Sequence, residues 1–273
     1  MLHPGAMGAA VGAALAERGE AVHWVSAARS AATCARAASA GLVEQRDLGG
    51  MLAAVDTVFS VCPPEAALDT ACGVAAAGFG GTYVDANAVA PATARRVGEV
   101  IVAAGGAFVD GAIVGGPPTT RGETRLFLSG PTAAAVAARF DGGAFETVVL
   151  GDEIGTASAL KVAYAAWTKG SGALLLAVRA FARSNGVDAA LLDEWSRSQP
   201  RLADRSSRTA RGNARKAWRF VAEMDEEADA FAASGLPDGF SRAAARMYER
   251  LTGYKDIEDV DPDAVFDALN RTT

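Results

Sequence analysis

A glycine-rich turn at the start of the chain constrains its fold more than any other feature. Residues 3–8 read HPGAMG and lead directly into a stretch of helical periodicity over residues 9–18. Gly19 is placed to stop this helix, and the apolar residues 21–25 are typical of a buried strand. A glycine turn that opens such a helix brings backbone N–H groups close to an anion. The pattern predicts a dinucleotide-binding turn, with its pyrophosphate held by Gly5, Ala6, Met7 and Gly8.

The beginning of this unit departs from the usual pattern in two ways. His3 stands where the G-x-G-x-x-G fingerprint has its first glycine, and only Met1 and Leu2 precede it. The first strand of the predicted sheet is therefore largely missing. Either the true start lies upstream, or the central strand is truncated and cofactor binding is weaker. We favour the first reading, because removing a central parallel strand exposes backbone groups and apolar surface.

The residues after the strand predicted over residues 21–25 bear on the choice of cofactor. An acidic residue about 20 positions beyond the glycines normally binds the ribose 2′-hydroxyl of NAD. This chain has Ser26 there, followed by Arg29 and Ser30. A hydroxyl and a guanidinium suit a 2′-phosphate, whereas a carboxylate would repel it. The pattern favours NADP over NAD; the alternative is a surface loop that happens to carry one arginine.

The rest of the chain divides into two parts with different periodicity. Helix-like and strand-like segments alternate up to residue 150, with the clearest strands at 56–61, 82–84 and 107–109 and later edge strands at 125–129 and 147–150. Only helical periodicity follows, over residues 154–181, 214–234, 238–251 and 262–270. We expect an α/β, doubly wound, Rossmann-like domain over residues 1–152 and an all-α domain over residues 153–273 that serves substrate binding and dimerisation.

Polar residues follow the predicted strands where parallel sheets bind ligands. Cys62 and Pro63 follow one strand and are expected to shape the ribose wall of the cofactor site. Asn87 follows the next strand, where it either hydrogen-bonds the cofactor or merely forms a turn.

Composition excludes several classes of function. The chain has 273 residues, half of them apolar, and a net charge of −6, which argues against a nucleic-acid partner. It has no apolar run long enough for a membrane span and no signal-peptide pattern, so we expect a cytoplasmic protein. Two histidines and three scattered cysteines offer no metal site. One basic run is expected to form a solvated helix face or loop or, alternatively, to meet an anionic substrate or the 2′-phosphate: Arg201, Arg205, Arg208, Arg211, Arg215 and Lys216.

The chain resembles the β-hydroxyacid dehydrogenases, which include 6-phosphogluconate and 3-hydroxyisobutyrate dehydrogenases. The resemblance is carried by the HPGAMG turn, by residues 85–88 with Pro91, by residues 110–116 and by Lys161. The helical half is most similar to a branch described only as phosphogluconate-dehydrogenase-like. The resemblance implies that Lys161 is catalytic and that the protein is a homodimer through its helical half, with Trp167, Trp195 and Trp218 as candidate interface residues.

Three positions depart from the family. Val114, Gly115 and Gly116 stand where relatives have a Ser-Gly-Gly that binds the substrate, and Ala165 replaces an asparagine one turn after the lysine. Residues 222–224 replace a Lys-Asp-Leu near the cofactor. The resemblance therefore implies a bulkier or less polar substrate than an ordinary 3-hydroxy acid.

Lys161 also stands out by its own chemistry. It lies in an apolar helical run, where a charge needs a reason, and partial desolvation lowers a lysine pKa toward the working range of a general acid or base. Tyr164, Thr168 and Lys169 lie near it on the helix and, with residues 114–116, are expected to form the substrate wall. Alternatively, Lys161 reaches solvent or pairs with Asp152 or Glu153.

The expected function is hydride transfer between NADP and a small hydroxy or keto substrate, with Lys161 as general acid and base. One alternative is an imine reductase, although such enzymes usually replace this lysine. Another is a non-catalytic NADP-binding sensor or scaffold.

Overall fold

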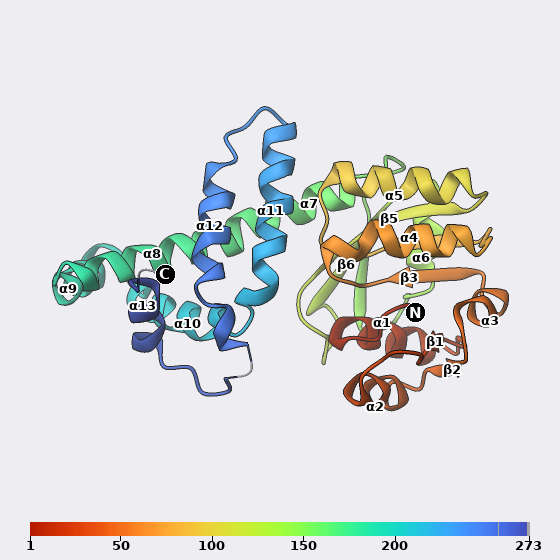
Figure 1. Cartoon of the computed structure of the whole chain (residues 1–273), viewed down its shortest axis with the longest axis horizontal. Helices are drawn as coiled ribbons and strands as arrows, with labels where there is room; N and C mark the ends of the chain where they lie inside the picture. Colours follow the sequence, from red (N-terminus) through yellow and green to blue (C-terminus); the bar gives the residue numbers. More distant parts are fainter. Residues whose placement is uncertain (256, 272–273) are drawn as a thin grey trace. The chain divides into compact units, whose positions relative to one another are not determined.

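The chain folds into two compact units, residues 1–162 and 163–273 (Figure 1). The structure is a computed structural model that describes residues 1–255 and 257–271. The division falls inside helix α7 (Thr156–Ala165), ten residues beyond the predicted domain boundary, so that Lys161 belongs to the first unit.

The first unit is built on strands in the order that the alternating pattern predicts. Five strands form one sheet, in which β3 (Thr57–Ser60), β4 (Thr82–Asp85) and β5 (Ala107–Val114) are parallel. Strand β6 (Thr124–Ser129) is antiparallel to β5, and β7 (Phe145–Val149) is parallel to β6. The short strands β1 (His23–Val25) and β2 (Val43–Gln45) form a separate parallel pair.

Both faces of this sheet are covered, as in a doubly wound fold. Val58, Tyr83 and Phe108 contribute to one buried cluster, and the next residue of each strand, Phe59, Val84 and Val109, contributes to another. Because neighbouring side chains of a strand point to opposite faces, the clusters lie on the two sides of the sheet. Helices α4 (Ala67–Ala76) and α5 (Pro91–Ala103) lie side by side on the first face (Figure 1). The second face carries α1 (Ala6–Ala16) and α6 (Ala133–Ala138).

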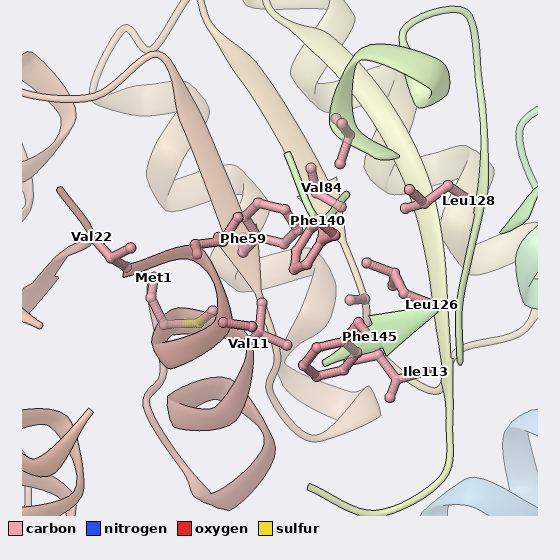
Figure 2. Close-up of a cluster of buried hydrophobic side chains, with 14 of the residues drawn as sticks. Met1, Val11, Val22, Phe59, Val84, Ile113, Leu126, Leu128, Phe140 and Phe145 are labelled. Carbon is pink, nitrogen blue, oxygen red and sulfur yellow. The ribbon is translucent and has the colours of Figure 1, made fainter. Parts of the chain in front are cut away.

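Met1 and Leu2 contact both the strand pair β1–β2 and strand β3. The Leu2 N–H donates to the carbonyl of Phe59 at 3.0 Å, and the Met1 amino group donates to the carbonyl of His23 at 2.8 Å. Met1 packs beside Val11 and Val22 in the buried cluster (Figure 2). A cavity of about 300 Å³ lies next to it, lined partly by Met1, Leu15, Val22 and Phe59.

Three further helical segments complete the first unit. They are α2 (Ala31–Ser39), α3 (Leu48–Ala53) and the short 3₁₀ turn η1 (Pro64–Ala66).

The second unit is entirely helical. A π-helical turn, η2 (Ala166–Gly170), leads into α8 (Ser171–Ser184), followed by α9 (Asp188–Ser198) and α10 (Leu202–Ala214). Helices α11 (Ala217–Ala233) and α12 (Gly239–Glu249) pack side by side (Figure 1), and η3 (Thr252–Tyr254) and α13 (Pro262–Leu269) follow. The residues of the basic run lie on or beside α10, and all six are exposed, as expected of a solvated face. No described helix of the protein is long and apolar enough to cross a membrane.

Candidate functional site in the N-terminal unit

The glycine turn is shaped by close backbone packing. A Cβ atom on Gly8 would lie 2.1 Å from the carbonyl oxygen of His3, so no larger residue fits there. Gly5 is the N-cap of α1, and this helix end has no side-chain cap. The first turn of α1 therefore presents backbone N–H groups and the positive end of the helix dipole, as an anion site requires. Gly5, Ala6, Met7 and Gly8 lie together at this helix end, as the sequence predicted.

His3 contributes a neutral ring to the same turn. Burial, with smaller contributions from the charges of Arg29 and the N-terminus, lowers the pKa of His3 to about 4. Its Nδ1 atom is buried without a hydrogen-bond partner. The residue that replaces the first glycine thus offers an unsatisfied polar atom beside the turn, and it carries no positive charge at neutral pH.

The segment after β1 forms a turn with polar side chains. The Arg29 N–H donates to the carbonyl of Ser26 at 3.0 Å, and Ala28 between them has a φ of 60°. Ser30 caps α2 by accepting from the Thr33 N–H at 3.3 Å. The Arg29 guanidinium donates to the carbonyl of Leu2 at 3.3 Å. The three residues predicted for the adenosine end of the cofactor lie within one short turn that reaches back to the start of the chain.

Sequence reasoning missed two charged residues near this turn. Arg36 donates to the carbonyl of Pro4 at 3.5 Å and to the Thr33 hydroxyl at 3.0 Å. Glu44 on β2 accepts a hydrogen bond from the Ser26 hydroxyl. The spacing from the glycines finds only residues on β1 and its loop, so a residue brought in by pairing with β2 gives no local signal.

Asn87 ties together the ends of β3 and β4. Its side-chain oxygen accepts from the Cys62 N–H at 2.6 Å, and its side-chain nitrogen donates to the Ser60 hydroxyl at 3.2 Å. Both ends of the amide are thus engaged within the protein. Asn87 fixes the backbone at Cys62 and Pro63, whereas burial raises the pKa of the Cys62 thiol and keeps it protonated.

Two buried carboxyl groups lie side by side in register, Asp85 at the end of β4 and Asp110 in the middle of β5. Asp85 pairs with Asp110 in the ladder. Asp85 accepts from the Asn87 N–H at 2.9 Å, but its second oxygen is buried without a partner. Burial, together with the neighbouring charge of Asp110, raises the pKa of Asp85 to about 7. At neutral pH this carboxyl is therefore protonated in a large fraction of the molecules.

Asp110 accepts four hydrogen bonds that fix the start of α7. The Ser158 hydroxyl donates to one carboxylate oxygen at 2.6 Å. The other oxygen accepts from the N–H groups of Ser158 and Gly155 at 2.9 and 3.0 Å and from the Ser129 hydroxyl at 3.2 Å. A carboxylate at a helix N-terminus also complements the helix dipole. Asp110 thus anchors the helix that carries Lys161.

Lys161 lies on α7 and reaches strand β5. Its ammonium Nζ donates to the carbonyl of Ile113 at 2.6 Å, and the residue is half-buried. Strand β5 therefore holds α7 twice, through the Asp110 carboxylate and through the Ile113 carbonyl.

The first glycine after β5 is required by the neighbouring strand. Gly115 has a φ of 127°, and a Cβ on it would lie 2.7 Å from the Thr124 hydroxyl. The same hydroxyl donates to the carbonyl of Gly116. Val114 is buried, so this segment presents backbone rather than a polar side chain.

The other predicted substrate residues belong to the helical unit. Tyr164 is 46% exposed, and the Thr168 hydroxyl donates to its carbonyl at 2.9 Å. Lys169 forms an ion pair with Glu223 and lies 5.1 Å from the centre of the Phe220 ring. Within this unit Lys169 therefore has a structural role between η2 and α11. Among the described residues no group of His, Cys, Asp and Glu could hold a metal ion.

Comparison with known proteins gives matches over both units. Residues 4–139 match the family model of the NAD binding domain of 6-phosphogluconate dehydrogenase, and residues 182–251 match a domain of unknown function, DUF1932. None of the curated proteins matches the sequence.

Solved structures share the fold over nearly the whole chain. A conserved protein of unknown function, described as structurally similar to 3-hydroxyacid dehydrogenases, is 26% identical, with a TM-score of 0.68 over 93% of this chain and 96% of that one. The 3-hydroxyisobutyrate dehydrogenase of Mycobacterium tuberculosis is 20% identical, with a TM-score of 0.70 over 99% and 98%. A reductive aminase from Aspergillus terreus, solved with NADPH, is 20% identical, with a TM-score of 0.58 over 97% and 96%.

These matches agree with the glycine turn and the doubly wound sheet. The first unit is the nucleotide-binding domain of an oxidoreductase, and the matches leave open whether it takes NAD or NADP. Residues 4–139 belong to the family of NAD binding domains of 6-phosphogluconate dehydrogenase, and the chain is a member of the β-hydroxyacid dehydrogenase-like superfamily.

Proposed function

We propose that the protein is an NADP-dependent oxidoreductase that transfers a hydride between the nicotinamide and a small hydroxy or keto compound. The observation that carries the proposal is the lysine at the end of β5, held at 2.6 Å by the Ile113 carbonyl within a dinucleotide-binding unit. Lys161 acts as the general acid and base.

The residues of the first unit fit the cofactor. The cradle at Gly8 leaves no room for a Cβ, and the α1 N-terminus above it has no side-chain cap. Ser26, Arg29 and Ser30 lie in one turn at the adenosine end and supply hydroxyls and a guanidinium for a 2′-phosphate. When bound, the cofactor supplies the hydride donor or acceptor. Cys62, Pro63 and Asn87 form a fixed backbone wall beside it.

Lys161 moves the proton that accompanies the hydride. In the oxidative direction its neutral amine accepts the proton of a substrate hydroxyl. In the reductive direction its ammonium donates a proton to the substrate oxygen as negative charge develops there. The Ile113 carbonyl takes one N–H of the ammonium and sets the direction of the side chain. The anchoring of α7 by Asp110 keeps Nζ in place.

The segment at residues 114–116 favours a substrate with a modest polar group. Val114 is buried, and Gly115 and Gly116 offer backbone alone. A substrate at this segment meets no charged side chain from it. We further propose that Tyr164 and Thr168 complete the substrate wall, with Lys169 behind them in its ion pair.

The test is the Lys161→Met variant, which keeps the length of the side chain and removes its proton. We expect turnover of the best substrate from a screen of hydroxy acids, keto acids, ketones and imines to fall by about 10²- to 10⁴-fold. The dissociation constant for NADPH, measured by nicotinamide fluorescence, should stay within about threefold, because Lys161 is not placed at the glycine turn.

Lys216→Met is the matched control, because Lys216 is an exposed lysine of the helical unit. It should turn over like the wild type. Equal turnover of Lys161→Met and wild type would refute the role of Lys161. Tight NADPH binding with no turnover by the wild type in any assay would favour the sensor or scaffold reading instead.

We also propose a cytoplasmic homodimer formed through the helical unit. Trp167, Leu174 and Phe181 recur every seven residues along η2 and α8 and are 68%, 66% and 68% exposed. Residues seven apart share a helix face, and a helix that is apolar on all sides is normally buried. A groove of about 920 Å³ adjoins this face, lined partly by Phe231 and Phe240.

The other two tryptophans do not contribute to this face. Trp195 is buried within its own unit, and Trp218 lies under the Lys255 ammonium at 4.4 Å from the ring centre. Leu174→Glu should convert the dimer to a monomer in sedimentation analysis, because a charge on that face is costly to bury. A wild-type protein that sediments as a monomer would contradict the proposal.

A further inference from the structure

A carboxylate lies beside the residue that should discriminate between the two nicotinamide cofactors. Strands β1 and β2 are paired with Trp24 opposite Glu44, and Ser26 follows β1 directly. The Ser26 hydroxyl donates its proton to the Glu44 carboxylate. Glu44 is an exposed residue of β2. A residue 18 positions further along the chain thus supplies the negative charge that the end of β1 lacks.

The cations of this region are directed elsewhere. Arg29 donates to the carbonyl of Leu2, and Arg36 donates to the carbonyl of Pro4. Both guanidinium groups therefore lie toward the glycine turn, whereas the carboxylate lies at Ser26. The two signs of charge are separated across the surface where the adenosine ribose is expected.

The two cofactors respond to this arrangement in opposite ways. A ribose 2′-hydroxyl can donate to a carboxylate, whereas a 2′-phosphate is repelled by it. The bond from Ser26 to Glu44 also uses the only proton of the serine hydroxyl, which a phosphate would otherwise accept.

We propose that Glu44 is a specificity-determining residue that weakens binding of the 2′-phosphate and so limits the preference for NADPH set by Arg29 and Ser30. The inference rests on the proposed function, because it assumes that this turn holds the adenosine end of the cofactor. Glu44 acts both through its own charge and through its hydrogen bond with Ser26.

The test compares Glu44→Gln with the wild type by titration with NADPH and with NADH, each at low and at physiological ionic strength. Glu44→Gln should lower the dissociation constant for NADPH by about tenfold and leave that for NADH within about twofold. The gain should shrink as salt is added, because the group is exposed. Glu44→Lys should lower the ratio of the dissociation constant for NADPH to that for NADH still further.

Glu146→Gln is the matched control, because Glu146 is an exposed glutamate on strand β7 of the same unit. It should leave both dissociation constants unchanged. An unchanged ratio in Glu44→Gln and Glu44→Lys would overturn the role of Glu44 alone. A wild type that prefers NADH, with a ratio that moves toward NADPH in Glu44→Gln, would overturn the proposed NADP preference and support Glu44. Failure of every form to bind either nucleotide would overturn both.

Discussion

The two ends of the N-terminal unit are held together in different ways. The strand pair β1–β2 and the five-stranded sheet are bridged by one hydrogen bond each from Met1 and Leu2, beside a cavity of about 300 Å³. At the end of β5, the Asp110 carboxylate accepts four hydrogen bonds, and the Ile113 carbonyl holds Lys161. The region proposed to carry the chemistry is thus held by several hydrogen bonds, whereas the region behind the glycine turn is held by few. Stability and geometry should therefore respond differently to changes at the two ends.

The largest effect is expected from Asp110→Ala. Removing this buried carboxylate leaves four donors without their acceptor, so the free energy of unfolding should fall by about 3–5 kcal/mol. The start of α7 should loosen, and turnover should fall with it. Urea denaturation measures the free energy of unfolding, and the hydrogen exchange of the Ser158 amide measures the loosening of α7.

Ser129→Ala is the milder companion of this variant, because it removes one donor to Asp110 and the acceptor of the Ala157 N–H. Its cost should be about 1–2 kcal/mol. Comparable stability of Asp110→Ala and Ser129→Ala would show that the carboxylate does not anchor the helix.

The next effect concerns Asp85, the carboxyl that has no partner for one oxygen. Its pKa is raised to about 7 in the folded state, so between about pH 4 and 7 the folded chain holds a proton that the unfolded chain has lost. The contribution of Asp85 therefore lowers stability as pH rises through this window. Asp85→Asn removes the charge and keeps an acceptor for the Asn87 N–H, so it should stabilise the protein by about 2 kcal/mol at pH 8.

The measurement is the difference in the free energy of unfolding between Asp85→Asn and wild type, determined by denaturation across pH 4–8. His3 and the Met1 amino group have lowered pKa values, so their contributions rise with pH and partly mask that of Asp85 in the wild type alone. The difference should be small at pH 4 and grow toward pH 8. A difference that is constant with pH would contradict the assigned pKa shift.

The smallest effect is expected at the other end, from a short extended segment such as Val-Ala-Val-Ile added before Met1. Burial lowers the pKa of the Met1 amino group to about 5, so the unfolded chain binds a proton between about pH 5 and 8 that the folded chain does not. Stability therefore rises with pH over this window. A peptide N–H in place of the amine should remove that rise and add about 1–2 kcal/mol at pH 7.

A Gly-Ser-Gly-Ser extension separates the two causes in this experiment. It removes the amine but places no apolar side chains near the cavity, so it should flatten the pH dependence with a smaller gain in stability. If neither extension alters the pH dependence, the amino group is not buried as the structure describes.

Local patterns were sufficient for most of the fold. The turn at Gly5 and Gly8, the alternating segments up to residue 150 and the helical second half all follow from backbone periodicity and glycine placement. The prediction that residues 125–129 form an edge strand was wrong, because β6 lies between β5 and β7 in the sheet; the later strand, β7, is at the edge. The helices α9 and α10 were missed, because their exposed faces are strongly polar and hide the apolar stripe.

The candidate site was likewise predicted only in part from local sequence patterns. The sequence by itself pointed to Lys161, through a charge within an apolar helical run together with the family resemblance. Only the tertiary structure decided what surrounds it: Asp110 meets Ser158 across 48 positions, and Ser26 meets Glu44 across 18. Periodicity reports which face of an element is apolar, whereas hydrogen-bond partners depend on strand register and helix placement, which are set by the packing of the whole unit.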